Sequence, residues 1–183
     1  GADARGIGTY ALGQSVNGNG IRPAPYSTNI GVNAYTYGNV GSLAMPHGVG
    51  FLWCTMLWEL NWELIDQYGF DPDLYHGTGG NNICMQLIID GMKLTPCSPG
   101  FVDARDAILL ADQSNNGGVN SEFIWAAFSK RGLGFSADQG SSNSTTDGTE
   151  AFDLPPDPKD NDMAILASTS PVEGDYLDCF TYH

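Results

Sequence analysis

The segment from Pro46 to Tyr68 constrains the fold of this chain more than any other. Pro46 suits a first helical turn, where its missing N–H costs nothing, and Gly69 suits a left-handed stop. A helix of about 23 residues would run about 35 Å, which is long enough to centre a helical bundle. Apolar residues recur in it at steps of three and four, as in a helix with one buried face: Val49, Leu52, Trp53, Met56, Leu57, Leu60, Leu64 and Ile65.

Three later segments have the same helical periodicity. We expect helices over 81–94, over 98–113 with Ser98 as N-cap and Pro99 in the first position, and over 122–130. The sequence therefore predicts a mainly α fold, with a helical bundle over residues 46–134. The side chains expected to face inward are Ile83, Leu87, Ile88, Met92, Phe101, Ala104, Ile108, Ala111, Phe123, Ile124, Ala127 and Phe128.

The segments on either side of the bundle have no such periodicity. Residues 1–45 contain nine glycines and read as a long irregular loop region, with one short helix or turn around 4–14. Tyr26, Tyr35 and Tyr37 favour an ordered loop, and an ordered loop of this length is usually functional. Residues 135–183 read as a polar linker and tail, because 136–150 is rich in Gly and Ser. A candidate strand at 163–168 could be the start of a further domain.

The charge of the chain limits the kinds of binding partner, and the positions of its cysteines suggest which thiols are buried. The chain has 21 acidic and 7 basic residues and a formal net charge of −14, so we expect no nucleic-acid partner. The same negative charge would be repelled by an anionic membrane surface, so we expect no membrane partner. No apolar run is long enough to span a bilayer, so we expect a soluble chain. Cys54 and Cys84 lie in helical patterns and are expected to be buried thiols. Cys97 and Cys179 lie in loop-like contexts and could pair in an oxidising compartment.

The residues alone indicate little catalytic chemistry. His47, His76 and His183 are too scattered for a zinc site, and the HExxH motif is absent. The acid pairs Glu59 with Glu63 and Asp103 with Asp106 are explained by polar helix faces.

The acidic turn at Asp71 and Asp73 is a candidate calcium site, although it does not fit an EF-hand loop. His47, at the start of the long helix, is on its own an ordinary polar residue near a surface.

Several long blocks of the chain resemble the fungalysin-type zinc metallopeptidases. They are DARGIGTYALGQ, IRPAPYST, PHGVGFLWCTMLWELNWELID, GTGGNNICMQLIIDGMKLTPCSPGFVDARDAILLADQ and IWAAFSKRGLG, within residues 1–134. The resemblance implies the C-terminal lobe of a secreted endopeptidase with a two-lobed, thermolysin-like fold. In that family the HExxH helix and the third zinc ligand precede this region. The resemblance therefore implies zinc in the intact enzyme, no metal ligand in this chain, and no activity of this chain alone.

The resemblance assigns roles to two residues. Arg22 in GIRPAPYST matches the arginine that binds a substrate carbonyl, and His47 in AMPHGVGF matches the histidine that donates to the oxyanion. A fixed cation and an imidazole donor stabilise negative charge as it develops, which is what such a reaction needs. The family orients this histidine with a carboxylate a few residues upstream. Here residues 41–46 contain none, and only Ser42 and Asn39 are near.

Two functions from different classes follow. The first is the C-terminal lobe of an extracellular zinc metalloendopeptidase, whose partners would be its own N-terminal lobe and a protein or peptide substrate. The second is a stand-alone helical binding or interaction module without catalysis. A longer precursor with HExxH shortly upstream of this chain would favour the protease.

Overall fold

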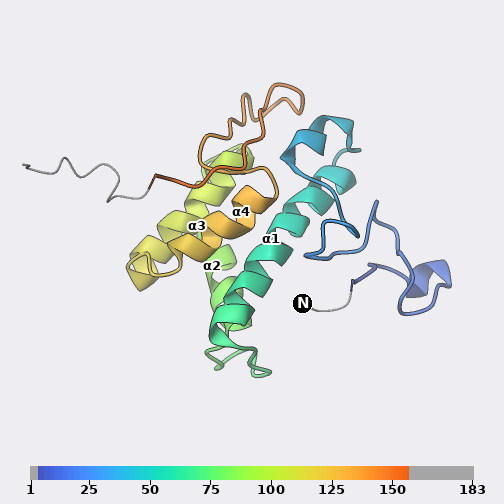
Figure 1. The fold of residues 1–183 in the computed structure, drawn as a ribbon, viewed down its shortest axis with the longest axis horizontal. Helices are drawn as coiled ribbons and strands as arrows, with labels where there is room; N and C mark the ends of the chain where they lie inside the picture. Colours follow the sequence, from blue (N-terminus) through green and yellow to red (C-terminus); the bar gives the residue numbers. More distant parts are fainter. Residues whose placement is uncertain (1–3, 157–183) are drawn as a thin grey trace, which may run out of the picture.

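The computed structural model describes residues 4–156, and they form a mainly helical fold (Figure 1). The long helices are α1 (His47–Tyr68), α2 (Gly80–Leu94), α3 (Phe101–Asn116) and α4 (Ser121–Lys130). Two short 3₁₀ helices, η1 (Tyr10–Leu12) and η2 (Tyr37–Ser42), precede them. Within residues 4–156, extended structure is limited to isolated bridges. The expectation of a mainly α fold is confirmed.

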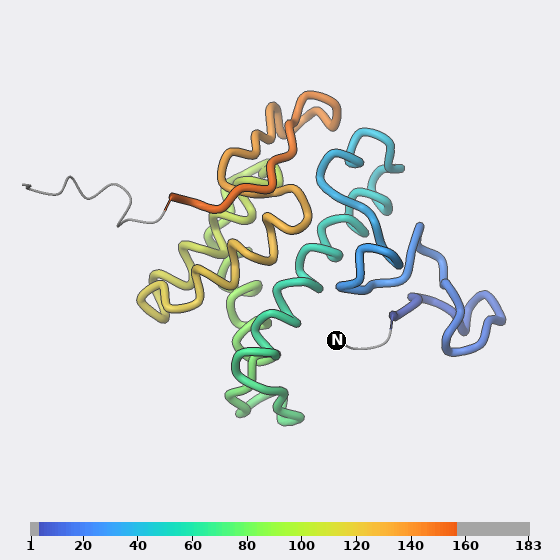
Figure 2. Tube along the Cα trace, viewed as in Figure 1, coloured from blue at the N-terminus to red at the C-terminus, as the bar shows by residue number. Residues whose placement is uncertain are grey.

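Helix α1 is the centre of the bundle, as its periodicity predicts. Helices α2 and α4 pack against α1, and α3 packs on α2 and α4, so α1 lies between them and the N-terminal segment (Figure 2). Leu52, Met56, Leu60 and Leu64 recur every four residues on α1 and are fully buried. That stripe faces the partner helices because side chains four apart share a helix face.

Helix boundaries agree with the sequence except at α3. The predicted N-cap is Ser98, but Ser98 has a φ of 54° and the helix begins at Phe101, with Gly100 as N-cap. Asp103 fixes this start, since its Oδ2 accepts a hydrogen bond from the Gly100 N–H at 2.9 Å. The helix also extends to Asn116 rather than 113. Among the predicted inward residues, Met92 is wrong, because its side chain is 65% exposed.

The N-terminal segment runs along one side of α1 (Figure 1). The helix or turn expected around 4–14 is the single 3₁₀ turn η1. Two isolated bridges, Arg5 with Tyr26 and Ile7 with Gly20, fold the segment back on itself. Its order comes from these pairings and from buried side chains rather than from regular helix.

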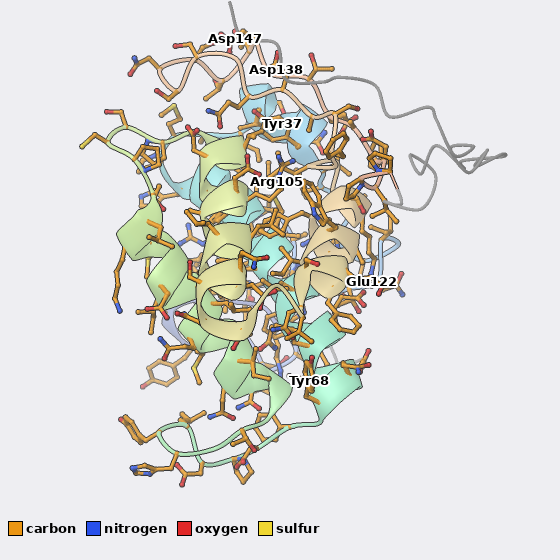
Figure 3. All side chains as sticks on the ribbon, turned by 90° about the vertical axis from the view of Figure 1, so that its left-hand side faces the viewer. Tyr37, Tyr68, Arg105, Glu122, Asp138 and Asp147 are labelled. Atoms are coloured by element: carbon orange, nitrogen blue, oxygen red, sulfur yellow. The ribbon has the colours of Figure 1, made fainter. Side chains whose placement is uncertain are left out.

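The polar run after the bundle is tied to the rest of the molecule as far as residue 156. Bridges join Leu133 to Ala151 and Asp138 to Thr149. Glu150 accepts hydrogen bonds from the Thr36 hydroxyl at 2.6 Å and the Gly38 N–H at 2.9 Å. In Figure 3 the labelled Tyr37, Asp138 and Asp147 lie at one end of the bundle. The candidate strand at 163–168 lies outside the described residues.

Two cysteine expectations have different outcomes. Cys84 is buried as expected, but the expectation for Cys54 is wrong, because its side chain is exposed. Cys97 is exposed, and its candidate partner Cys179 lies outside the described residues. In residues 4–156 no helix is both long enough and apolar enough to cross a bilayer.

Candidate functional site

His47 is the first residue of α1, and its side chain is exposed. Counting along the helix, Phe51, Cys54 and Trp58 follow at steps of four, three and four. Residues at this spacing lie on one face, so His47 begins a stripe along the outer side of α1. This stripe is separate from the core-facing stripe of Leu52, Met56, Leu60 and Leu64.

The loop that carries Arg22 packs on the same stripe. The ring of Tyr26 lies 5.4 Å from the ring of Phe51 and 6.0 Å from that of Trp58, measured between centroids. Burial raises the pKa of the Tyr26 phenol above its ordinary value, Cys54 adds to the rise, and the positive charge of Arg22 opposes it. The half-buried Arg22 therefore has its guanidinium near the Tyr26 hydroxyl.

These contacts place Arg22 and His47 on the same side of α1. Arg22 lies beside Tyr26, and Tyr26 packs on the stripe that His47 begins. Within residues 4–156 no side-chain hydrogen bond or ion pair joins the two. Their relation is a shared face of the molecule rather than a direct contact.

The two polar residues near His47 in sequence are occupied elsewhere. Asn39 Oδ1 accepts a hydrogen bond from the Thr36 N–H at 2.8 Å, and the Ser42 hydroxyl donates to the Asn39 carbonyl at 2.8 Å. Both bonds stabilise η2. Neither residue orients the His47 imidazole.

Glu59, Lys130 and Arg131 form a charge cluster that the sequence analysis does not predict. Glu59 is expected on a polar face of α1, but it is fully buried. Its carboxylate pairs with the Arg131 guanidinium, through Nε at 2.7 Å, and with Lys130 Nζ at 2.7 Å. The signal in the sequence is its spacing, because Glu59 follows the buried Thr55 and Met56 by four and three residues and so shares their face of α1.

The described residues do not provide a complete set of metal ligands. Residues 4–156 contain no cluster of three or more His, Cys, Asp or Glu side chains able to hold a metal ion. His47 begins α1 and His76 follows its other end, and the 22 residues of α1 span about 33 Å. The described residues therefore do not by themselves fit a zinc site.

The predicted calcium turn uses its carboxylates internally. Asp71 accepts hydrogen bonds from the Asp73 and Thr78 N–H groups, and Asp73 accepts them from the Tyr75 and His76 N–H groups. These bonds hold the pKa of Asp73 below its ordinary value. Calcium at this turn stays a prediction.

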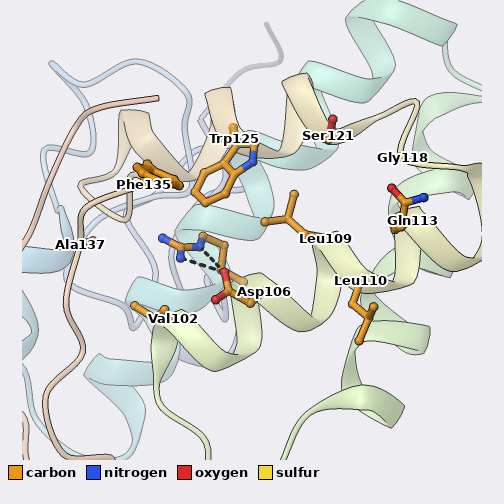
Figure 4. A pocket seen from close by; sticks show the side chains of 11 residues that line it. Val102, Asp106, Leu109, Leu110, Gln113, Gly118, Ser121, Trp125, Phe135 and Ala137 are labelled. Atoms are coloured by element: carbon orange, nitrogen blue, oxygen red, sulfur yellow. Dashed lines mark hydrogen bonds and ion pairs between the residues drawn. The ribbon is translucent and has the colours of Figure 1, made fainter. Parts of the chain in front are cut away.

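One groove of the bundle lies on α3 and α4 and has a volume of about 710 Å³ (Figure 4). It is lined by two charged residues, Arg105 and Asp106. The Arg105 guanidinium stacks on Trp125 at 4.5 Å and donates to the Leu133 carbonyl at 3.1 Å. Arg105 also pairs with Asp106 at 2.8 Å. These partners satisfy the guanidinium, and the groove presents more apolar than polar surface.

Comparison with known proteins agrees with the resemblance seen in the sequence. Residues 2–137 match the profile of the fungalysin metallopeptidases (M36). The chain belongs to the fungalysin family. It spans about a fifth of the length of the curated relatives it matches, 22% of one and 20% of another.

Three fungal relatives illustrate the similarity. "Extracellular metalloproteinase MEP" of Fusarium vanettenii is 47% identical over 76% of this chain, and that of Neosartorya fischeri is 50% identical over 68%. "Extracellular metalloproteinase 2" of Trichophyton tonsurans is 43% identical over 75% of this chain and 22% of its own length. The similarity is to one part of each fungalysin-family relative.

Proposed function

We propose that this chain is the C-terminal lobe of a secreted zinc metalloendopeptidase that hydrolyses peptide bonds in proteins. The zinc ligands and the general base would lie upstream, in an N-terminal lobe, so the chain alone would be inactive. The proposal rests on membership of the fungalysin family, since relatives with 43–50% identity are extracellular metalloproteinases.

Arg22 and His47 are this chain's contribution to the reaction. Arg22 would bind a substrate carbonyl, and the His47 imidazole would donate a hydrogen bond to the carbonyl oxygen as negative charge develops on it. Donors fixed in advance stabilise the transition state more than the ground state. Two features support these roles, namely the exposure of His47 and the position of Arg22 on the same side of α1.

The first test measures activity in the full-length secreted protein. His47→Ala should lower kcat for a peptide substrate by about 10²-fold or more, the size of a lost oxyanion donor. His76→Ala is the matched control, because His76 is also an exposed histidine but follows α1 instead of beginning it, and its kcat should be unchanged. An unchanged kcat in the His47 variant would remove His47 from the mechanism.

Measuring bound zinc tests whether the metal ligands lie upstream of this chain. The full-length protein should retain one zinc per molecule after dialysis, and the 183-residue chain should retain none. Tight zinc binding by the chain alone would contradict the placement of the ligands upstream. A full-length protein without zinc or proteolysis would favour the helical binding module instead.

A further inference from the structure

Arg131 connects three parts of the molecule from a fully buried position directly after α4. Toward α1, its guanidinium pairs with Glu59. Toward the N-terminal segment, it donates to the backbone carbonyls of Ser27 at 2.7 Å, Asn33 at 2.5 Å and Tyr35 at 3.2 Å. One side chain therefore fixes the loop over 27–35 to both α1 and the end of α4.

The backbone of Arg131 and a second buried side chain complete the attachment. The Arg131 carbonyl accepts the Tyr37 N–H at 2.8 Å. Asn33, also fully buried, donates through its amide to the Pro25 carbonyl and to the Thr55 hydroxyl of α1, both at 3.2 Å. The loop between Arg22 and α1 is thus held by polar contacts at both of its ends.

Only an arginine can satisfy this arrangement. The guanidinium presents five donors in a fixed planar fork, so it serves the Glu59 carboxylate and three carbonyls together. A lysine would keep the positive charge beside Glu59 but could not reach all of these acceptors. Lys130 provides a natural contrast, because its ammonium pairs with the same carboxylate at 2.7 Å but does not bond to the loop over 27–35.

We propose that Arg131 is a positioning residue for substrate binding, which sets the place of Arg22 by clamping the loop over 27–35 onto α1. This inference rests on the proposed function of Arg22. The chain of contacts runs from Arg131 to the Ser27 carbonyl, then through the adjacent Tyr26 to Arg22. His47 is set by α1 itself, so Arg131 acts on Arg22 and leaves His47 in place. Misplacement of a binding group by about 1 Å can cost a hundredfold in rate.

The test is a set of double-mutant cycles in the full-length secreted protein. Arg131→Lys should lower kcat/KM by about tenfold to a hundredfold. In an Arg22→Met background the same substitution should have little further effect, within about twofold, because the residue through which it acts is gone. In a His47→Ala background its full effect should persist. A loss of overall stability would lower activity equally in all three backgrounds.

Two further variants separate the clamp from the charge pair. Lys130→Met, the matched control, removes a cation from Glu59 without touching the loop, and kcat/KM should stay within about twofold. Asn33→Ala loosens the loop and leaves the Glu59 pair intact, and it should reproduce the Arg131→Lys pattern. If Arg131→Lys does not fold, the Asn33→Ala variant tests the positioning role in its place.

The outcomes distinguish the two proposals. Equal losses of kcat/KM in the wild-type and Arg22→Met backgrounds would overturn the positioning role while leaving the protease assignment intact. If Arg22→Met and His47→Ala each leave kcat/KM unchanged, their proposed roles fail, and the role of Arg131 fails with that of Arg22.

Discussion

The helical bundle and the N-terminal segment are held together in different ways. Helix α1 alone buries a continuous row of apolar side chains, and the other three helices add to the same core. In the segment over 4–46, the buried side chains are fewer and two of them are polar: Tyr26, Ser27, Asn33, Tyr37 and Val40. The bundle therefore depends on many small apolar contacts, whereas the segment depends on a few specific polar ones.

This difference separates stability from function. Apolar packing is spread over many residues, so it tolerates change at the surface of the bundle. A buried polar contact has no substitute when one partner is lost, because the other partner remains buried and unpaired. The segment that carries Arg22 is therefore the more easily displaced part of the candidate site.

The largest expected effect comes from the bundle core. Leu60→Ala removes a fully buried side chain of α1 and should lower the free energy of unfolding by about 2–5 kcal/mol, because a cavity remains. Urea denaturation of the 183-residue chain measures this. Leu110→Ala, at a leucine that is 51% exposed on α3, is the control and should change stability by about 0.5 kcal/mol or less. Equal effects at the two leucines would break the comparison.

The same difference explains what the sequence could predict. Leu52, Met56, Leu60 and Leu64 were predicted to be buried because helical periodicity is a local property of the sequence. The start of α3 was misplaced because Ser98-Pro99 is a sound N-terminal signal, yet Asp103 caps the helix at Gly100. Local patterns identify the helices well and their ends less well.

The candidate site was predictable only in part. Its two residues, Arg22 and His47, came from family resemblance, since no local pattern marks either. The Arg131 clamp joins residues 98 and 104 positions apart in the chain, and no periodicity reports such a contact. Burial of Glu59 likewise depends on the approach of Lys130 and Arg131 from α4.

The second prediction concerns how the stability contributed by a polar contact depends on pH. Asp103 holds the start of α3, and hydrogen bonds from the Gly100 N–H and from Gln139 keep its pKa below the ordinary value. A depressed folded pKa gives stability that is present above the unfolded pKa of about 3.9 and is lost as pH falls through the folded pKa. Asp103→Ala should therefore cost about 1 kcal/mol at pH 7, the usual size of a lost cap.

Thermal unfolding of both proteins between pH 7 and pH 2 checks this. The difference between wild type and Asp103→Ala should be constant at neutral pH and should shrink once the pH falls below the unfolded pKa. Gln139→Ala, which removes one donor to Asp103 but keeps the Gly100 bond, should retain most of the pH dependence. A difference that stays constant down to pH 2 would mean that the carboxylate charge does not stabilise the cap. The effect of Leu60→Ala, by contrast, should have no such pH dependence.

The last prediction has the smallest expected effect and needs no substitution. It compares the reactivity of two thiols, Cys54 on α1 and Cys84 on α2. Cys54 is exposed beside Tyr26, whereas Cys84 lies in the core, where burial raises the pKa of its thiol to about 12. Because the thiolate is the reactive form, Cys84 is protected both by burial and by its pKa. Maleimide labelling followed by peptide mass mapping should modify Cys54 in the folded chain and Cys84 only as the bundle unfolds. Modification of Cys84 at the rate of Cys54 would mean that the core does not protect its thiol. The bundle would then be no more stably packed than the surface of α1 beside the N-terminal segment.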